Sequence, residues 1–340
     1  AAMDYGGSHH NGPGPDALLA SAPFAKFTPL LDDLLEHEEL VRSAPHELHA
    51  HFPAVKMASF RAALATLARQ RLLARAPLDM LLRLTALLRG VFEPASSLVL
   101  SLDAQSANAP LHPHLALALE ALLTVLAIMT APGIPRQLRS EDLIEAVLTF
   151  TKTHLRVNIF PAHDISYLRP SSASASANTL YTGRSDGESD DDDDVDDDDD
   201  GFGDHASDDN SSAPLAAGGA RGKAPRARKA AKLRTVNMLT TKIIDAFAAW
   251  RALVQLTTHS DTVVLGLTSM ILSTFFVEGV APLQLATLPV IQSIFARYPL
   301  HRLTILEDIL TSLDKLPVSR RGLRSYRIEH EIVPFLPGSA

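Results

Sequence analysis

The stretch from Phe275 to Ile328, FFVEGVAPLQLATLPVIQSIFARYPLHRLTILEDILTSLDKLPVSRRGLRSYRI, decides the fold class of this chain. Apolar residues recur there at steps of three, four and three in two successive segments, 282–298 and 301–313. Steps of this size place side chains on one face of an α-helix. The two sets are Leu288, Ile291, Phe295 and Tyr298, and Leu303, Leu306, Leu310 and Leu313. The stretch therefore predicts two amphipathic helices, and the short connection between them favours an antiparallel pair.

The same helical periodicity extends through most of the 340 residues. It predicts helices that start near Ala58 and at Pro77, a long apolar helix over 113–129, a helix after Ser140, and further helices over 235–256 and 261–275. No segment shows the sustained apolar–polar alternation that is typical of strands. Leu and Ala dominate and aromatic residues make up only 6% of the chain, which also favours helices. The predicted fold class is all-α, an α-solenoid of about four antiparallel helix pairs.

Composition divides the chain into five parts. We predict a mostly disordered N-terminal region over 1–57, helical repeats over 58–170, a disordered linker that is first acidic and then basic over 171–234, helical repeats over 235–328, and a tail over 329–340. The chain starts without Met and ends abruptly, so we expect it to be a section of a longer protein.

The formal net charge of −8 conceals two segments of opposite sign. Fifteen acidic residues lie between Asp186 and Asp209, including two runs of five aspartates around Val195. Self-repulsion keeps such a segment unfolded. The other 24 of the 39 acidic residues stand against 31 basic ones, a surplus of seven positive charges. This separation of charge is a reason to consider an anionic partner, although it does not identify one.

Two basic clusters are candidate DNA-binding sites. The first is RGKAPRARKAAKLR, whose cations are Arg221, Lys223, Arg226, Arg228, Lys229, Lys232 and Arg234. The second consists of Arg320, Arg321, Arg324 and Arg327, several of which are spaced to share a helix face. Cations at this density can neutralise phosphates or form a nuclear import signal. The alternatives are a solvated linker that offsets the acidic run, and arginines that cap a helix end or pair with Glu307, Asp308 or Asp314.

Other classes of site have little support. The chain contains no cysteine, which excludes disulfides and thiolate zinc sites. The histidines of 46–51 and 112–114 lack a third ligand at a fixed offset, so we expect no metal site. A Gly-rich phosphate loop, a nucleophile elbow and a His-Glu-x-x-His motif are all missing, so we expect a non-enzymatic protein without a cofactor. The longest apolar runs are interrupted or too short to span a bilayer, and no secretory signal is visible, which predicts a soluble chain.

Several short motifs resemble a known family. They are FFVE (275–278), LQL (283–285), FARY followed by HR (295–302), ILEDILTSL (305–313) and LP-x-S-x-R-x-LR-x-(Y/F)-R (316–327). A second block contains IMTAPGIP (128–135) and EDLIEAVLTFTKTHLRVNIFPAHD (141–164). In this order and spacing the motifs resemble the Nipped-B family, large HEAT-repeat proteins that load cohesin onto chromosomes. The resemblance covers about 115–327 and is broken by the acidic run.

The resemblance implies the following expectations. The solenoid is of the HEAT type, and the function is cohesin loading onto chromatin in sister chromatid cohesion, by a non-enzymatic scaffold that binds DNA and cohesin and stimulates the ATPase of cohesin. The partners are the cohesin complex and duplex DNA in the nucleus, and a helical-repeat adaptor that binds through regions outside this chain. One alternative is a nuclear HEAT or armadillo scaffold such as a transport receptor, but Trp250 is the only tryptophan and no Trp–Asn ladder is present. Another alternative is a histone-binding module built on the acidic run.

Overall fold

The computed structural model describes residues 22–100, 111–163, 223–277 and 279–313, and over 223–234 it describes the backbone alone. The regular elements in these ranges are helices, and none is a strand. The α-helices are α2 (Ala22–Glu36), α3 (Glu38–Ser43), α4 (Leu48–His51), α5 (Ala54–Arg69), α6 (Leu78–Phe92), α7 (Pro113–Thr130), α8 (Glu141–His154), α9 (Phe160–His163), α10 (Lys223–Leu256), α11 (Asp261–Phe275), α12 (Ala281–Arg297) and α13 (Arg302–Ser312). The predicted all-α class is confirmed.

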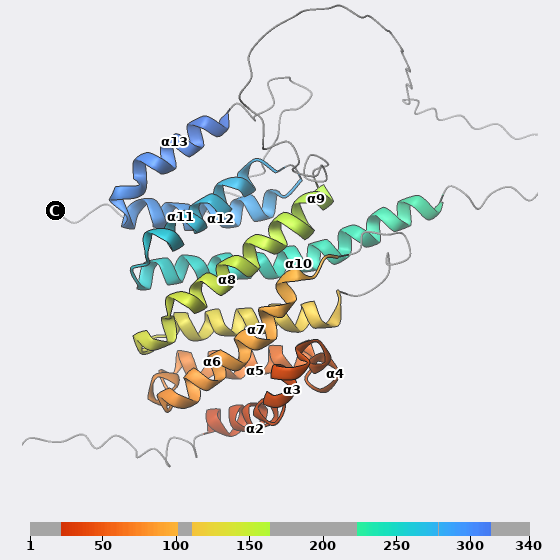
Figure 1. Cartoon of the computed structure of the whole chain (residues 1–340), viewed down its shortest axis with the longest axis vertical. Coiled ribbons are helices and arrows are strands. Elements are labelled where there is room, and N and C mark those ends of the chain that lie inside the picture. The colour runs from red at the N-terminus through yellow and green to blue at the C-terminus, as the bar shows by residue number, and fades with distance from the viewer. Residues whose placement is uncertain (1–21, 101–110, 164–222, 278, 314–340) are drawn as a thin grey trace, which may run out of the picture.

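The helices form two layers that rise from α2 at one end of the molecule to α13 at the other (Figure 1). Helices α5, α7, α10 and α12 lie side by side in one layer, and α6, α8, α11 and α13 form the other. Each helix of the first layer is followed along the chain by a helix of the second layer that runs back in the opposite direction (Figure 1). The layers pack on each other through contacts such as those of α6 with α7 and of α11 with α12. This is the arrangement of antiparallel pairs that the periodicity predicts.

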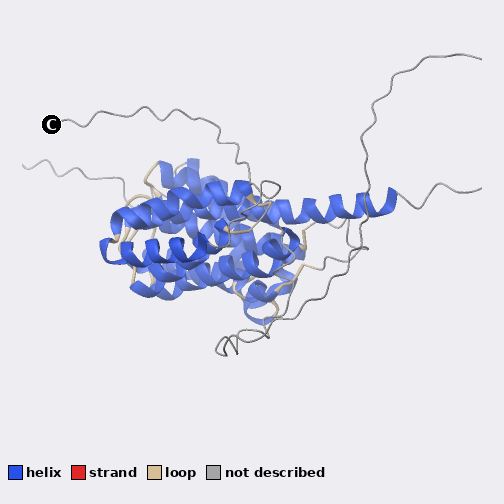
Figure 2. Cartoon of the chain, turned by 90° about the horizontal axis from the view of Figure 1, so that it is seen from above, coloured by secondary structure: helices blue, strands red, loops and turns tan. Residues whose placement is uncertain are grey.

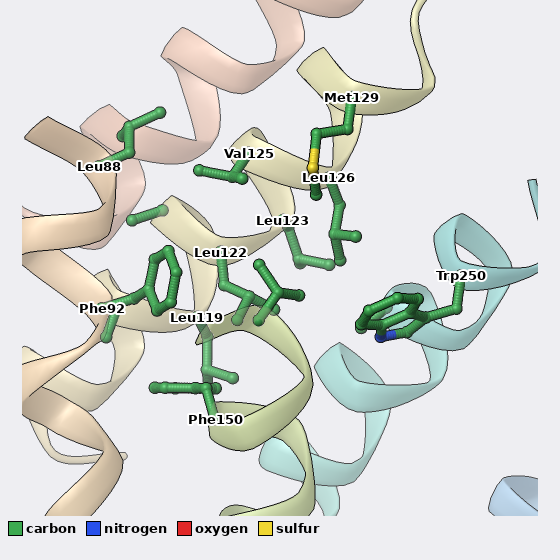
Figure 3. Close-up of a cluster of buried hydrophobic side chains, with 14 of the residues drawn as sticks. Leu88, Phe92, Leu119, Leu122, Leu123, Val125, Leu126, Met129, Phe150 and Trp250 are labelled. Atoms are coloured by element: carbon green, nitrogen blue, oxygen red, sulfur yellow. The ribbon is translucent and has the colours of Figure 1, made fainter. Parts of the chain in front are cut away.

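Helix α7 lies at the centre of the core. Nearly all of its side chains are buried, because α5, α6 and α10 pack around it. Figure 3 shows Leu119 and Leu122 of this helix among Phe92 of α6, Phe150 of α8 and Trp250 of α10. Its neighbours α5 and α10 in the same layer, and α6 in the second layer, therefore depend on α7 for the burial of their apolar faces.

In the part of the chain that the structure describes, α7 is the one helix that is long and apolar enough to cross a membrane by length and composition. Glu120 interrupts the uncharged run within it, but the helix itself is continuous from Pro113 to Thr130. Its apolar window is 78% buried inside the protein. All-round apolarity is also what the core helix of a multilayer array requires, and the packing of α7 accounts for its composition in that way.

The described helices begin with α2 at Ala22, well before the boundary predicted at residue 58. The buried residues of α2 are Phe24, Phe27, Leu31 and Leu34, at steps of three, four and three. Helix α2 packs on α5, and the ring of Phe27 stacks on that of Phe60 with 5.0 Å between centroids. The prediction of a mostly disordered region is thus wrong for 22–57. Pro29 lies inside the helix, where a proline removes a backbone hydrogen bond and is unfavourable. The burial of the apolar face outweighs this free-energy cost. Residues 1–21 lie outside the described residues.

Helix α10 begins at Lys223, whereas the sequence analysis expects a start near Thr235. The basic end of the segment 171–234, expected as a disordered linker, is therefore helical. Ala, Lys and Arg are strong helix formers, and Pro225 lies in the first turn, where its missing N–H removes no helical hydrogen bond. The acidic run and the tail after 313 lie outside the described residues.

The apolar faces predicted for the last two helices are only partly right. In α12 the buried residues are Leu283, Gln284, Thr287, Val290 and Ile294, whereas Leu288 is exposed. In α13 only Ile305 is buried, and the predicted set of Leu303, Leu306, Leu310 and Leu313 is 45–67% exposed. A helical repeat in the sequence defines a face but not the neighbour that covers it. Helix α13 is the last described helix, and α11 together with the turn before α13 forms its main contacts.

Candidate nucleic-acid interface

The basic start of α10, defined as residues 223–234, extends past the packed helices (Figures 1 and 2). These twelve residues contain six cations and no acidic residue. At about 1.5 Å per residue they span about 18 Å of helix. A positively charged helix of this length that stands clear of the body can approach an extended polyanion without a clash from neighbouring helices. The basic start of α10 is thus the candidate interface for nucleic acid.

The composition of α10 changes sharply at Val236. Before it, Leu233 is the only large apolar residue, so the basic start has no apolar stripe to bury. From Val236 onward the helix has a buried apolar face, made up of Val236, Leu239, Ile243, Phe247 and Trp250. One continuous helix therefore joins a highly charged segment to a firmly packed one, which fixes the direction in which the charged segment points.

A buried ion-pair cluster attaches the packed part of α10 to the core. The carboxylate of Glu120, in the middle of α7, is 6% exposed. It accepts a hydrogen bond from Nε of Arg61 on α5 at 3.0 Å, and it lies 3.0 Å from Nη2 of the same arginine and 2.6 Å from Nζ of Lys242 on α10. Two cations from the flanking helices thus surround one carboxylate, which links α5, α7 and α10 electrostatically and accounts for the only charge inside α7.

The sequence-predicted cations fall in two places. Lys223, Arg226, Arg228, Lys229, Lys232 and Arg234 belong to the basic start of α10. Arg221, Arg320, Arg321, Arg324 and Arg327 lie outside the described residues, so the second cluster remains a prediction. The sequence analysis missed that the first cluster is a helix joined to the core, and the helix-forming composition of KAPRARKAAKLR was the signal that could have shown it.

Motif residues that carry the family resemblance hold helix ends together. Gln284, in LQL, is buried, and its Nε2 donates to the carbonyls of Phe275 (2.8 Å) and Val277 (2.9 Å). It thereby provides donors for carbonyls at and just beyond the C-terminal end of α11. Gly279 follows with φ +72°, and a Cβ there would lie 3.3 Å from Nδ1 of His163. The FFVEG turn is therefore determined by packing and backbone satisfaction.

The motif FARY followed by HR has a similar role. Arg302 donates from Nε to the Phe295 carbonyl at 2.7 Å, and its guanidinium lies 5.3 Å from the centre of the Phe295 ring. The hydroxyl of Tyr298 accepts from the backbone N–H of His259 at 2.8 Å. His301 contacts Asp261 at 2.8 Å between Nε2 and Oδ1. These residues thus bind the α12–α13 turn to the α10–α11 turn.

Arg139, which follows the motif IMTAPGIP in the sequence, forms hydrogen bonds with carbonyls at the C-terminal end of α7. Arg139 donates from Nε to the Met129 carbonyl at 2.6 Å and from Nη2 to the Ala131 carbonyl at 3.5 Å. Burial lowers the pKa of this guanidinium from its usual value. Gly133 has φ +76° in the turn that follows the helix, a conformation that glycine adopts without strain. Ser140 occupies the expected N-cap position of α8, but its side chain makes no capping hydrogen bond.

A buried histidine and asparagine join α8 to the segment after α6. His154 directly precedes the π-helical turn Leu155–Ile159 and Asn158 lies within it, with Nδ2 of Asn158 2.7 Å from Nδ1 of His154. Asn158 also accepts from the N–H of Leu100 at 2.7 Å and donates to the carbonyl of Leu98 at 3.0 Å. Burial lowers the pKa of His154 to about 4, and a backbone contact with Ala95 opposes this without cancelling it. His154 is therefore neutral at physiological pH.

The other histidines noted in the sequence make local contacts. Nδ1 of His49 lies 2.6 Å from the carbonyl of His46, and the ring of His51 lies 5.4 Å from that of His37. His112 occupies the N-cap position of α7, and His114 is buried, which lowers its pKa. Within the described ranges, no group of three or more His, Asp or Glu side chains is arranged to hold a metal ion.

Comparison with known proteins identifies relatives of this chain. No protein-family model matches it. It is 27% identical to Nipped-B-like protein A of Danio rerio over 92% of this chain and 12% of that protein. It is 32% identical to the Nipped-B-like protein of Homo sapiens over 62% of this chain and 6% of that protein. The Nipped-B protein of Drosophila melanogaster is 34% identical over 29% of this chain and 5% of its own length. The chain thus spans about an eighth or less of the curated relatives that it matches.

One solved structure shares the fold. The C-terminal fragment of the Chaetomium thermophilum cohesin loader SCC2 matches 88% of this chain and 21% of that chain, with a TM-score of 0.55 and 19% sequence identity. This likeness concerns the arrangement of helices, whereas the sequence relationship rests on the animal proteins. The predicted resemblance is therefore confirmed, and this chain is related to a short section of the Nipped-B-like proteins, with the helical fold of a cohesin loader fragment.

Proposed function

We propose that this chain is a section of the scaffold of a cohesin loader, which acts on chromatin in the nucleus and takes part in sister chromatid cohesion. The observation that carries the proposal is the sequence match to Nipped-B-like proteins over 92% of the chain. The structural roles of Gln284, Tyr298, His301 and Arg302 support it, because these motif residues hold the turns of a two-layer solenoid in place. Stacked helices of this kind keep charged surfaces at constant separations.

In this proposal the chain contributes surfaces and no catalysis, and ATP hydrolysis belongs to cohesin. The test is retention of purified cohesin by the immobilised full-length chain at about 150 mM salt, a concentration at which weak surface contacts are largely screened. We expect the immobilised chain to retain cohesin, and we expect free chain added in solution to compete for cohesin and reduce this retention. If a chain that is folded by circular dichroism retains no cohesin even at low salt, this section does not contact cohesin and that part of the proposal is wrong.

We further propose that the basic start of α10 contacts the phosphates of duplex DNA. Changing Arg226, Arg228, Lys229 and Lys232 together to Ala should weaken binding and reduce the slope of log affinity against log salt by about 3 to 4, since each lost phosphate contact removes about 0.9. Alanine keeps the helix propensity high, so that the helix itself is retained. The measurement is fluorescence anisotropy of a labelled duplex titrated with the full-length chain at several salt concentrations.

The matched control replaces Arg226 and Arg228 with Lys, which preserves the charge of the basic start. This control should bind with nearly the affinity and salt slope of the wild type, because a phosphate contact requires charge more than the bidentate geometry of arginine. An unchanged slope in the fourfold alanine variant would show that the DNA contacts lie elsewhere on the chain.

A further inference from the structure

A shallow groove of about 510 Å³ lies between α10 and α12, on the packed part of the first layer. Two exposed arginines line it, Arg251 of α10 and Arg297 of α12, together with the polar side chains of Gln255, Gln292 and Ser293. Arg297 donates from Nη1 to the Gln255 carbonyl at 2.9 Å, and Nε2 of Gln255 lies 3.3 Å from Oγ of Ser293. These contacts hold one guanidinium at the end of α10 and leave its other N–H groups available.

The charge environment distinguishes this groove from two other surface hollows. In those hollows each arginine faces an acid: Arg83 pairs with Glu38, and Arg89 pairs with Glu93 at 2.8 Å. The α10–α12 groove has no carboxylate among its lining residues. Within the described residues, neither Arg251 nor Arg297 has an acidic partner within ion-pair distance. Two uncompensated guanidinium groups beside polar side chains form a site suited to an anion such as a phosphate.

Helix α10 connects this groove to the basic start. Lys229, near the middle of the basic start, and Arg251 are 22 residues apart on one continuous helix. At about 1.5 Å per residue this corresponds to about 33 Å. One turn of B-form DNA has nearly the same length, about 34 Å. Phosphates of a duplex that lies along α10 would therefore come close to the protein at both places.

We propose that the α10–α12 groove is a second phosphate-binding site, so that a DNA duplex is held at two points one helical turn apart along α10. The inference rests on the proposed contact between DNA and the basic start, and it adds Arg251 and Arg297 to that contact. Asp245 is exposed on α10 between the two points and has no ion-pair partner among the described residues. Its negative charge opposes the approach of the duplex.

The experiment compares two duplexes with the full-length chain: an 8-bp hairpin of about 27 Å, too short to reach both points, and a 24-bp duplex of about 82 Å. Changing Arg251 and Arg297 to Ala should weaken binding of the 24-bp duplex about tenfold at about 100 mM salt and lower its salt slope by about 2. Binding of the 8-bp hairpin to the basic start should remain within about twofold of the wild type. Asp245→Asn should strengthen binding of the long duplex.

The matched control removes the same number of charges by changing Arg83 and Arg89, on α6 of the other layer, to Ala. An equal loss of affinity in this control would mean that the groove acts only through the overall charge, and the inference would be wrong. The same conclusion follows if the double groove variant binds the 24-bp duplex with unchanged affinity and slope. If the wild type binds neither duplex at 50 mM salt, the proposed DNA contact of the basic start fails as well.

Discussion

Replacing Glu120 with Gln is expected to lower the free energy of unfolding by about 3 kcal/mol, because it leaves two cations facing a neutral side chain within the first layer. The carboxylate of Glu120 is 6% exposed and contacts Arg61 at 3.0 Å and Lys242 at 2.6 Å. Glutamine preserves the size of the side chain, so the change removes charge without opening a cavity. Urea unfolding followed by circular dichroism measures the loss directly.

Replacing only one of the two cations should lower the free energy of unfolding by less than replacing Glu120 does. With Arg61→Met or Lys242→Met, Glu120 keeps one cation, and the side chains of both cations are about one third exposed, so each change is expected to cost about 1 kcal/mol. The triple variant with Glu120→Leu, Arg61→Met and Lys242→Met should recover most of the stability, since an apolar replacement of a buried cluster is often neutral. A Glu120→Gln variant as stable as the wild type would show that the cluster contributes nothing to the packing of α7.

Acidification should destabilise the fold through His154, by up to about 3 kcal/mol between pH 6.5 and pH 4. Burial lowers the pKa of His154 from 6.5 in the unfolded chain to about 4 in the folded one. In this window the unfolded chain binds a proton and the folded chain does not. The stabilisation is therefore fully present above pH 6.5, and it is lost as the pH falls towards the pKa of the folded state. Unfolding free energies from urea titrations at several pH values test this.

The variant His154→Gln isolates this contribution, because glutamine can still accept the hydrogen bond from Asn158 but does not titrate. Burial also lowers the pKa of His114, His163 and His259, so the wild type should show a larger total acid effect than His154 alone produces. The difference between wild type and variant should grow as the pH falls. A difference that stays constant from pH 7 to pH 4 would contradict a neutral His154 in the folded chain.

The motif residues have structural roles that bear on what the family resemblance means. Gln284 and Arg302 satisfy backbone carbonyls at the ends of α11 and α12, and Tyr298 connects two turns of the solenoid. Buried backbone groups without partners are costly, so side chains that supply those partners tolerate few substitutions. The buried motif residues therefore identify how consecutive helices are joined, whereas Arg297 of FARY is exposed and lines the proposed α10–α12 groove.

The periodic segments are where prediction from the sequence succeeds. The helices expected over 113–129 and 261–275 agree with α7 and α11 to within a residue, because a long apolar pattern bounded by Pro or by a capping Ser has few alternatives. The N-terminal helix α2 is missed because Pro29 and the surrounding Gly, Pro and His residues obscure a regular apolar face. The basic start of α10 is missed because charge is easily taken for disorder when no apolar stripe accompanies it.

For the candidate site, the charged residues could be read from the chain alone, because the cations of 223–234 are evident without any structure. The packing of the helices shows in addition that this run is the protruding end of a helix whose other part is buried against the core. It also brought Arg251 and Arg297 together, 46 residues apart in the chain, and left the leucines of α13 exposed while burying Ile305. The physical reason is the same in each case. Periodicity defines the faces of a helix locally, but which face is buried, and which side chains meet across a groove, depends on neighbouring helices that are distant in the sequence.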